Sequence, residues 1–284
     1  MNTLLNYFFS LSNRVRDSFY FLMTLIGLVS AFCTVLGVSL VDLQYFNFWI
    51  RLGLVIAVLI VLYIVIYYLI GRIFNNSVTL KINGTTVNIL HGDIFKIPGL
   101  KVIGCDSHFD TRIDDVVISK NSLHGKLVLE HGNISDIKES INKEASRLDI
   151  NRNENGLYNF PLGTVICYYN SDEKETYLML AMTELDNDYR AYTDMATFEN
   201  MLMKMWQEID RVYAGRPIVL PILGTGISRF KDGAKKPETL LRCLLCTLSG
   251  SGVTLKSDVN VVIHGNSKEF SLYEYRYMFK WRQN

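Results

Sequence analysis

The sequence predicts a mixed α/β sandwich with a largely parallel sheet, preceded by a transmembrane helical hairpin. Two long apolar runs without charged residues open the chain, at residues 18–41 and 52–71. No comparable run occurs in residues 72–284, where short β-branched segments alternate with segments of helical periodicity. Such alternation is typical of mostly parallel sheets that are covered by helices.

Each apolar run reaches the roughly 20 residues that a helix needs to cross a bilayer. The link between the runs, residues 42–51, is too short to hold a folded module, so both chain ends are expected on one side. A signal peptide is the alternative for the first run, but the run is long and a second run follows it. We expect an N-terminal cytoplasmic segment (1–17), two transmembrane helices (18–71) and one further domain (72–284).

The charges around the two runs predict the orientation. Arg14 and Arg16 precede the first run and Arg72 follows the second, whereas the link carries Asp42 and a single cation, Arg51. Cationic residues favour the cytoplasmic side, so the large domain is expected in the cytoplasm. The sequence thus predicts a multi-pass membrane protein.

The domain behind the hairpin carries no net charge. It has 26 Lys+Arg (29 less Arg14, Arg16 and Arg51) and 26 Asp+Glu (28 less Asp17 and Asp42). Nucleic-acid binding depends on neutralising phosphates, so this balance argues against a nucleic-acid partner. Cys243 and Cys246 form a lone C-x-x-C in an apolar helical stretch without a second ligand pair, which favours core thiols over zinc. No metal and no cofactor are expected.

The first elements of the domain follow from turn and cap signals. Asn83-Gly84 lies between two β-branched stretches, residues 78–82 and 85–90, and predicts a type I′ hairpin. Residues 116–119 fit a strand or a helical turn equally well. Asn133 or Ser135 is suited to cap a helix with apolar residues at helical spacing from Ile134 to Leu148.

The second half of the domain repeats the alternation. Residues 164–169 and 177–182 are expected to form buried strands, and Thr193 or Asp194 to cap a long amphipathic helix. Residues 217–222 form another expected strand, Pro237 begins the next helix, and 259–263 is the last strand. Parallel sheets bind ligands at the carboxyl ends of their strands.

A glycine turn directly follows the expected strand at 217–222. Gly224-Thr225-Gly226-Ile227-Ser228-Arg229-Phe230 can present consecutive backbone N–H groups to an anionic diphosphate, and the helix beyond Pro237 can add its dipole. The alternative is an ordinary strand-to-helix turn, since a lone G-x-G is neither a Rossmann nor a Walker motif.

A second turn, His91-Gly92-Asp93-Ile94, follows the strand that ends at Leu90. An isolated Gly-Asp is usually a plain turn. Together with the glycine turn it resembles the two outer signatures of the macro domain, a three-layer α/β sandwich that binds ADP-ribose and its relatives. The resemblance implies that Asp93 and the Ile94 amide bind adenine, that Gly224 to Ser228 surround the diphosphate, and that Phe230 packs by the distal ribose.

The first phosphate loop departs from the catalytic macro-domain pattern. In place of an Asn-rich strand end and a run of glycines the chain has Cys105-Asp106-Ser107-His108-Phe109-Asp110-Thr111 and then Ser122-Leu123-His124-Gly125. With the two apolar runs, these motifs resemble the divergent macro domains of Thoeris anti-phage effectors that are fused to a transmembrane hairpin. Asp106, Asp110 or His124 would suit an ammonium, a carboxylate or an imidazole on the ligand. The alternative is that Asp110 and Asp114 only cap the loop and that His124 is a packed core histidine.

The Thoeris resemblance implies a sensor in a prokaryotic inner or plasma membrane, and not an enzyme. A TIR-domain partner consumes NAD and makes an ADP-ribose-derived signal, expected here to be histidine-ADP-ribose. Binding would drive homo-oligomerisation and damage to the lipid bilayer. The rival hypothesis is a membrane-tethered ADP-ribosyl hydrolase, which the missing Asn-rich strand end disfavours; a scaffold with a vestigial pocket is the third.

Overall fold

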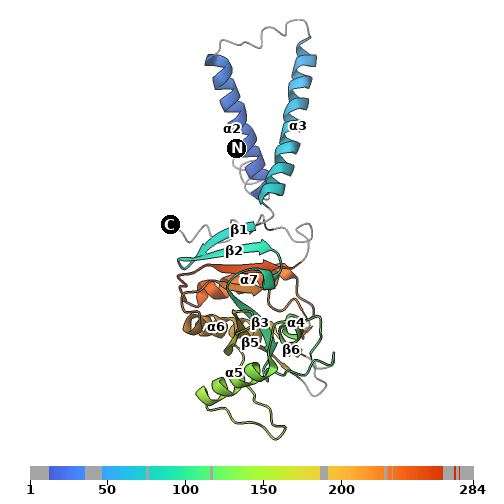
Figure 1. The fold of residues 1–284 in the computed structure, drawn as a ribbon. Coiled ribbons are helices and arrows are strands. Elements are labelled where there is room, and N and C mark those ends of the chain that lie inside the picture. The colour runs from blue at the N-terminus through green and yellow to red at the C-terminus, as the bar shows by residue number, and fades with distance from the viewer. Residues whose placement is uncertain are drawn as a thin grey trace. The chain divides into compact units, whose positions relative to one another are not determined.

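The computed structural model describes residues 13–35, 47–74, 77–115, 118–185, 191–226, 229–231, 233–264, 272 and 275. The chain divides into two compact units (Figure 1). One comprises Met1–Val78 with Ser267–Asn284, and the other comprises Thr79–Asn266.

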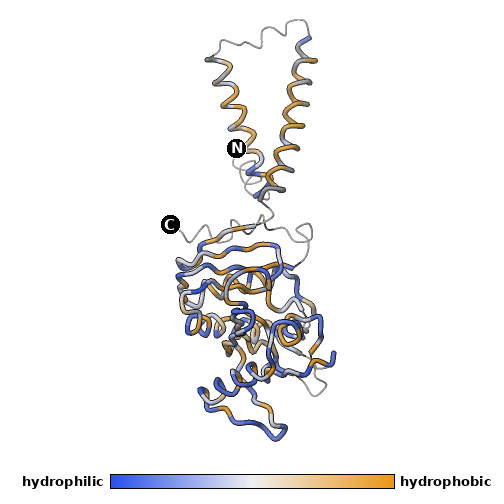
Figure 2. The backbone as a smooth tube through the Cα atoms, viewed as in Figure 1, coloured by the Kyte–Doolittle hydropathy of each residue, from blue (hydrophilic) through white to orange (hydrophobic). Residues whose placement is uncertain are grey.

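The first unit contains two long helices, α2 (Asn13–Val35) and α3 (Phe48–Phe74). The Arg14 guanidinium joins them, because its Nε and Nη2 atoms donate to the Tyr67 carbonyl at 3.1 and 2.7 Å. The same guanidinium lies 3.9 Å from the centre of the Tyr67 ring. Apolar residues dominate both helices (Figure 2), and many of their side chains, such as Trp49 and Tyr68, are exposed.

Among the residues that the structure describes, no helix is long and apolar enough to cross a membrane. The predicted transmembrane hairpin is therefore unsupported, and the predicted multi-pass membrane location is wrong by this finding.

Nine described strands form one mixed sheet in the order β1-β2-β9-β7-β3-β5-β6-β8, with β4 paired to β5 beside this path. The pairs β2–β9, β9–β7, β7–β3, β3–β5 and β6–β8 are parallel, whereas β4–β5 and β5–β6 are antiparallel. The strands are β1 (Ser77–Ile82), β2 (Thr85–His91), β3 (Leu100–Asp106), β4 (Val165–Asn170), β5 (Glu175–Leu185), β6 (Ala191–Thr193), β7 (Ile218–Pro221), β8 (Arg229–Phe230) and β9 (Val259–Ile263). The predicted mixed, largely parallel sheet is confirmed.

Most predicted boundaries agree with the structure. Asn83 and Gly84, at φ 48° and 78°, form the turn between β1 and β2 as predicted. Asn133 caps α5 and Asp194 caps α6, each through its side-chain oxygen. The undecided segment at 116–119 starts with two residues outside the described ranges, and its described residues form neither helix nor strand. The helices are η2 (Ile94–Lys96), α4 (Leu123–Glu130), α5 (Ile134–Arg147), α6 (Met195–Val212) and α7 (Pro237–Gly250).

Helices lie on both faces of the sheet (Figure 1). On one face, α4 and α5 close a core that contains Ile103, Cys105 and Val219 from the central strands. On the other, α6 and α7 are joined by the buried bond from Trp206 Nε1 to Thr247 Oγ1, at 3.2 Å. This arrangement leaves the carboxyl ends of the parallel strands to be covered by loops.

The sequence did not predict the central strand β3. Its second residue is Lys101, which is only 1% exposed, and a buried cation interrupts the apolar pattern of a strand. The Lys101 ammonium is paired with Glu175 Oε2 at 2.6 Å and lies 5.9 Å from the Tyr177 ring centre. The neighbouring strand β5 therefore supplies the partner that makes this burial possible.

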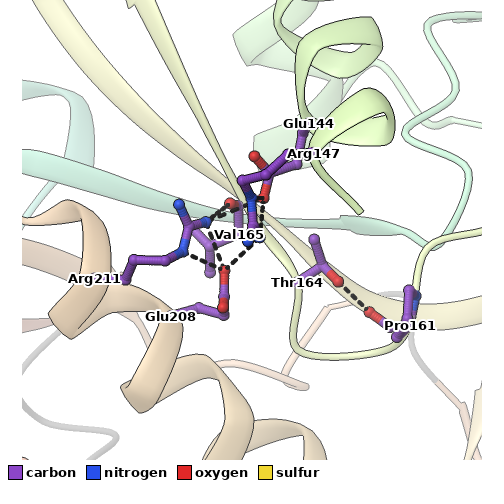
Figure 3. A network of polar contacts seen from close by, with 7 residues as sticks. All are labelled: Glu144, Arg147, Pro161, Thr164, Val165, Glu208 and Arg211. Carbon is purple, nitrogen blue, oxygen red and sulfur yellow. Dashed lines mark hydrogen bonds and ion pairs between the residues drawn. The ribbon is translucent and has the colours of Figure 1, made fainter. Parts of the chain in front are cut away.

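An alternating network of four charged residues joins α5 to α6 (Figure 3). Glu144 Oε1 accepts from Arg147 Nη2 at 2.6 Å and from Arg211 Nη2 at 3.0 Å. Arg211 Nη2 also donates to Glu208 Oε2 at 2.6 Å and to the Val165 carbonyl of β4 at 3.4 Å. Glu144 is the best shielded of the four side chains, at 12% exposed, so it holds both guanidinium groups.

Glu144→Ala is expected to lower the free energy of unfolding by about 1–2 kcal/mol, because two half-buried guanidinium groups lose a shared hydrogen-bond acceptor and, of the described residues, only Glu208 still lies against both. Denaturant unfolding at low and high salt measures this loss, which should shrink as salt rises. Glu139→Ala, on the exposed side of the same helix, is the control and should change stability by less than about 0.5 kcal/mol. Equal losses in both variants would show that the network contributes nothing specific.

Candidate functional site

Three of the predicted motifs follow neighbouring parallel strands. The Asp93 turn follows β2, the glycine turn follows β7 and the Asp106 loop follows β3. These strands lie in the order β2-β9-β7-β3 and are parallel, so their carboxyl ends share one edge of the sheet. Segments more than a hundred residues apart in sequence are thus brought to one edge, where open α/β sheets bind ligands.

The Asp93 turn presents a partly exposed carboxylate. Asp93 caps η2, and its Oδ1 accepts from the Phe95 N–H at 3.1 Å. Its Oδ2 lies 3.8 Å from Lys96 Nζ, and 43% of the Asp93 side chain remains exposed. Ile94 is instead buried in the core. One carboxylate oxygen therefore fixes the turn while the other is available to accept a further hydrogen bond.

Stacked aromatic rings hold the residues that follow Asp93. Phe95 stacks on His131 with ring centres 4.3 Å apart and planes inclined by 17°. His131 Nδ1 lies 2.9 Å from Glu173 Oε1, and the Tyr177 hydroxyl donates to Glu173 Oε2 at 2.9 Å. Burial and the Glu173 hydrogen bond raise the pKa of Tyr177, so the phenol keeps its proton. None of these supporting residues was predicted, because only the fold brings them together.

The glycine turn owes its shape to Gly224. Its φ of +83° is in the left-handed region, and an added Cβ would meet Phe198 at 3.3 Å and Leu240 at 3.4 Å. Thr225 Oγ1 donates to the Ile222 carbonyl at 2.8 Å and closes the turn. Gly226 does not have a left-handed φ, and no atom of the described residues lies within 4 Å of a Cβ built there. The space at Gly226 is open.

The end of the predicted phosphate motif pairs with the sheet. Phe230 is 6% exposed and packs edge-to-face on Phe198 at 5.5 Å, so it serves the core in this structure. Arg229 belongs to β8 and is in register with Tyr192 of β6. Ile227 and Ser228 lie outside the described residues.

The loop after β3 is held by the buried Asp106 carboxylate. Asp106 Oδ1 accepts from the His108 N–H at 2.8 Å, and both oxygens are 3.3–3.4 Å from the Asp110 nitrogen. Phe109 in this loop has a left-handed φ of 50°. His108 Nδ1 lies 2.6 Å from the Tyr158 carbonyl. The Asp106 side chain thus shapes the loop, a role that the sequence did not predict for it.

Asp110 and His124 lie beside Asp106 and complete a buried polar cluster. Asp110 Oδ2 accepts from Arg112 Nε at 2.8 Å and Nη2 at 2.5 Å. Burial favours the neutral acid, but these bonds outweigh it and hold the pKa of Asp110 below its ordinary value. Burial lowers the pKa of His124 despite the opposing Asp106 and Asp110 carboxylates, so the imidazole is neutral at pH 7.

The Asp110–Arg112 pair predicts an acid-dependent contribution to stability. Because the pKa of Asp110 is lower in the folded than in the unfolded state, its contribution is present above about pH 4 and is lost as pH falls further. The unfolding free energies of the wild type and Asp110→Asn should therefore differ at pH 7 and converge toward pH 2. Denaturant titrations at each pH test this; a difference that stays constant to pH 2 would contradict the shift.

The remaining residues of the first loop have local roles. Ser122 caps α4, since its Oγ accepts from the Gly125 N–H at 2.9 Å. A Cβ at Gly125 would collide with the Ser119 carbonyl, which explains the glycine. Thr111 lies between Asp110 and Arg112 and is half-buried. Arg112 was missed from sequence, although its position two residues after Asp110 suits a side-chain pair.

No group of three metal-ligating side chains that could hold an ion occurs within the described ranges. Cys243 Sγ lies 3.5 Å from Glu199 Oε1, and burial together with this carboxylate raises the pKa of Cys243 to about 11. The thiol is therefore protonated at neutral pH and poorly suited to ligate a metal.

The family model described as "Thoeris protein ThsA, Macro domain" matches residues 87–264, which include all three loops of the site. The chain belongs to the ThsA macro-domain family. The chain is also similar to a curated relative, the Thoeris protein ThsA of Bacillus amyloliquefaciens strain Y2. The two are 29% identical over 226 residues, 75% of this chain and 74% of the relative.

Solved macrodomains of Oceanobacillus iheyensis are similar in structure to this chain. The macrodomain with ADP has a TM-score of 0.49 and 16% identity, covering 73% of this chain and 98% of its own. A mutant of it with ADPR has a TM-score of 0.49 and 15% identity, covering 72% and 97%. The family match, and not these structures, decides the assignment.

Proposed function

We propose that this ThsA macro domain is a non-catalytic sensor of an ADP-ribose-derived nucleotide and acts as a Thoeris anti-phage effector. The observation that carries the proposal is the convergence of the Asp93 turn and the glycine turn at one sheet edge within the segment that matches the family. The name of the curated relative supports the Thoeris role.

The strand order supports the following arrangement of the proposed ligand. Two strand spacings separate β2 from β7, about 10 Å at roughly 4.8 Å each. Asp93 would accept from the adenine amino group beside Ile94, and the ribose would bridge this distance. The diphosphate would lie on the turn of Gly224, Thr225 and Gly226, with Ile227, Ser228 and Arg229 following.

The loop after β3 would then receive the distal ribose and whatever is attached to it. Phe230 would need to leave Phe198 to pack on this ribose, so its contact is the least supported by the geometry. Neutral His124 offers one donor and one acceptor to a second imidazole, as histidine-ADP-ribose requires. The Arg112 guanidinium is 52% exposed and is held by Asp110. It suits a carboxylate on the ligand, because a guanidinium can donate two parallel hydrogen bonds to a carboxylate and an ammonium cannot.

Calorimetry of the protein tests this function directly. ADP-ribose and the product of a TIR-domain enzyme acting on NAD should bind, with the histidine conjugate tighter than ADP-ribose, and neither should be consumed during incubation. Release of free ADP-ribose from an ADP-ribosylated peptide or ester would instead favour the ADP-ribosyl hydrolase. Absence of binding to every ADP-ribose-containing compound would reject the proposal.

The partners follow from the same proposal. The TIR-domain enzyme would act through its diffusible product and without contact, and ligand binding would favour a homo-oligomer. Light scattering with and without the bound nucleotide tests the second point, since the mass should rise only with ligand. A mass that does not change with ligand would show that nucleotide binding does not drive assembly.

A further inference from the structure

His91 is a half-buried histidine that the proposed site does not yet use. Its Nδ1 and Nε2 are both buried, and neither has a hydrogen-bond partner. Among the described residues no other side chain has a buried nitrogen or oxygen in this state. Buried polar atoms are rarely left unpaired, because each loses its bonds to water without replacement. A binding partner that is not part of the folded chain would explain the exception.

The position of His91 puts it within reach of the nucleotide. It is the last residue of β2, at the strand end that carries the site, and is in register with Ile263 of β9. The Gly92 N–H that follows donates to the Ile263 carbonyl at 3.1 Å, which fixes the chain between His91 and Asp93. Two residues of extended chain span at most about 7 Å, so the imidazole and the Asp93 carboxylate can contact one ligand group.

The direction of the His91 side chain agrees with this position. Side chains alternate along a strand, so His91 shares a sheet face with Val87 and Ile89. Through the registers of β9, β7 and β3 this is also the face of Gly104, which lies near Leu223 of the glycine turn. His91 therefore lies on the side of the sheet where the proposed diphosphate turn begins.

We propose that His91 is a base-specificity residue that donates a hydrogen bond to a ring nitrogen of adenine beside its amino group. This inference rests on the proposed function, since it assumes adenine at Asp93. A carboxylate can only accept, so Asp93 selects the amino group, which lies between two acceptor ring nitrogens of adenine. The Ile94 N–H can donate to only one of them, so the other is left without a partner. The ring N–H of His91 is a donor that matches it. The pair would read the donor and the acceptor of one adenine edge.

The test compares wild type, His91→Phe and His91→Gln by calorimetry with ADP-ribose and with its 1-deaza- and 7-deaza-adenine analogues. His91→Phe keeps the volume of a ring without the donor, and His91→Gln keeps an N–H donor. We expect about tenfold weaker ADP-ribose binding in His91→Phe and partial recovery in His91→Gln. One of the two deaza analogues should bind the wild type about tenfold more weakly than ADP-ribose does. The same analogue and ADP-ribose should bind His91→Phe equally well.

Thermal unfolding without ligand separates binding from folding. His91→Phe should unfold at the same or a higher temperature than the wild type, because it removes two buried unpaired atoms. If the wild type binds ADP-ribose and His91→Phe binds it equally well, the inference is wrong and the proposed function stands. If both deaza analogues bind the wild type like ADP-ribose, the inference is also wrong. If the wild type binds no adenine nucleotide, both fail together.

Discussion

Gly226→Val is expected to fold like the wild type and to bind an ADP-ribose-type nucleotide at least a hundredfold more weakly. Within the part of the chain that the structure describes, a Cβ at Gly226 meets no atom within 4 Å, and the residue does not need a left-handed φ, so we expect the protein to tolerate the side chain. The branched side chain would fill the open space in which we place the diphosphate. Thermal unfolding without ligand and calorimetry with ADP-ribose give the two quantities.

Gly224→Ala is the matched variant for this prediction. At φ +83°, with Phe198 and Leu240 close by, a methyl group should lower the free energy of unfolding by roughly 1–2 kcal/mol. Gly224 would then be the residue that shapes the turn and Gly226 the one that approaches the ligand. If Gly226→Val binds ADP-ribose with wild-type affinity, the diphosphate does not lie on this turn.

Asp93→Asn is expected to weaken ADP-ribose binding by roughly 1.5–3 kcal/mol, or about 10- to 150-fold. The amide oxygen can still accept from the Phe95 N–H, so the cap of η2 and the turn are kept. The second oxygen, which lies toward Lys96 in the free protein, becomes an NH₂ group that cannot accept from the adenine amino group. Calorimetry with ADP-ribose measures the loss.

A ligand with a different base is the control for Asp93→Asn. Inosine diphosphate ribose carries a carbonyl in place of the adenine amino group, so it should bind the wild type poorly and Asp93→Asn comparatively well. Asp93→Ala also removes the cap, at a further cost in stability of about 1 kcal/mol. Unchanged selectivity between the two bases in Asp93→Asn would show that Asp93 does not read the base.

Local signals in the sequence predicted most of the elements that the structure contains. The φ > 0 turn at Asn83-Gly84, the caps at Asn133 and Asp194 and the apolar strand at Val259–Ile263 each depend on a few adjacent residues. Strand β3 was missed because its buried Lys101 has its partner, Glu175, in another strand. The two N-terminal helices were expected from apolar length alone, but the described part of neither meets the requirement for a membrane span.

The sequence by itself determined the two turns at Asp93 and Gly224–Gly226 and, through them, the resemblance that the family match bears out. Turn chemistry is local, because glycine and aspartate act on their own backbone neighbours. The tertiary structure alone decided what surrounds those turns. It paired Asp110 with Arg112 beside neutral His124, stacked His131 under Phe95, and left both nitrogens of His91 buried without a partner. These relations depend on strand order and on burial, which bring together residues that no spacing in the sequence connects.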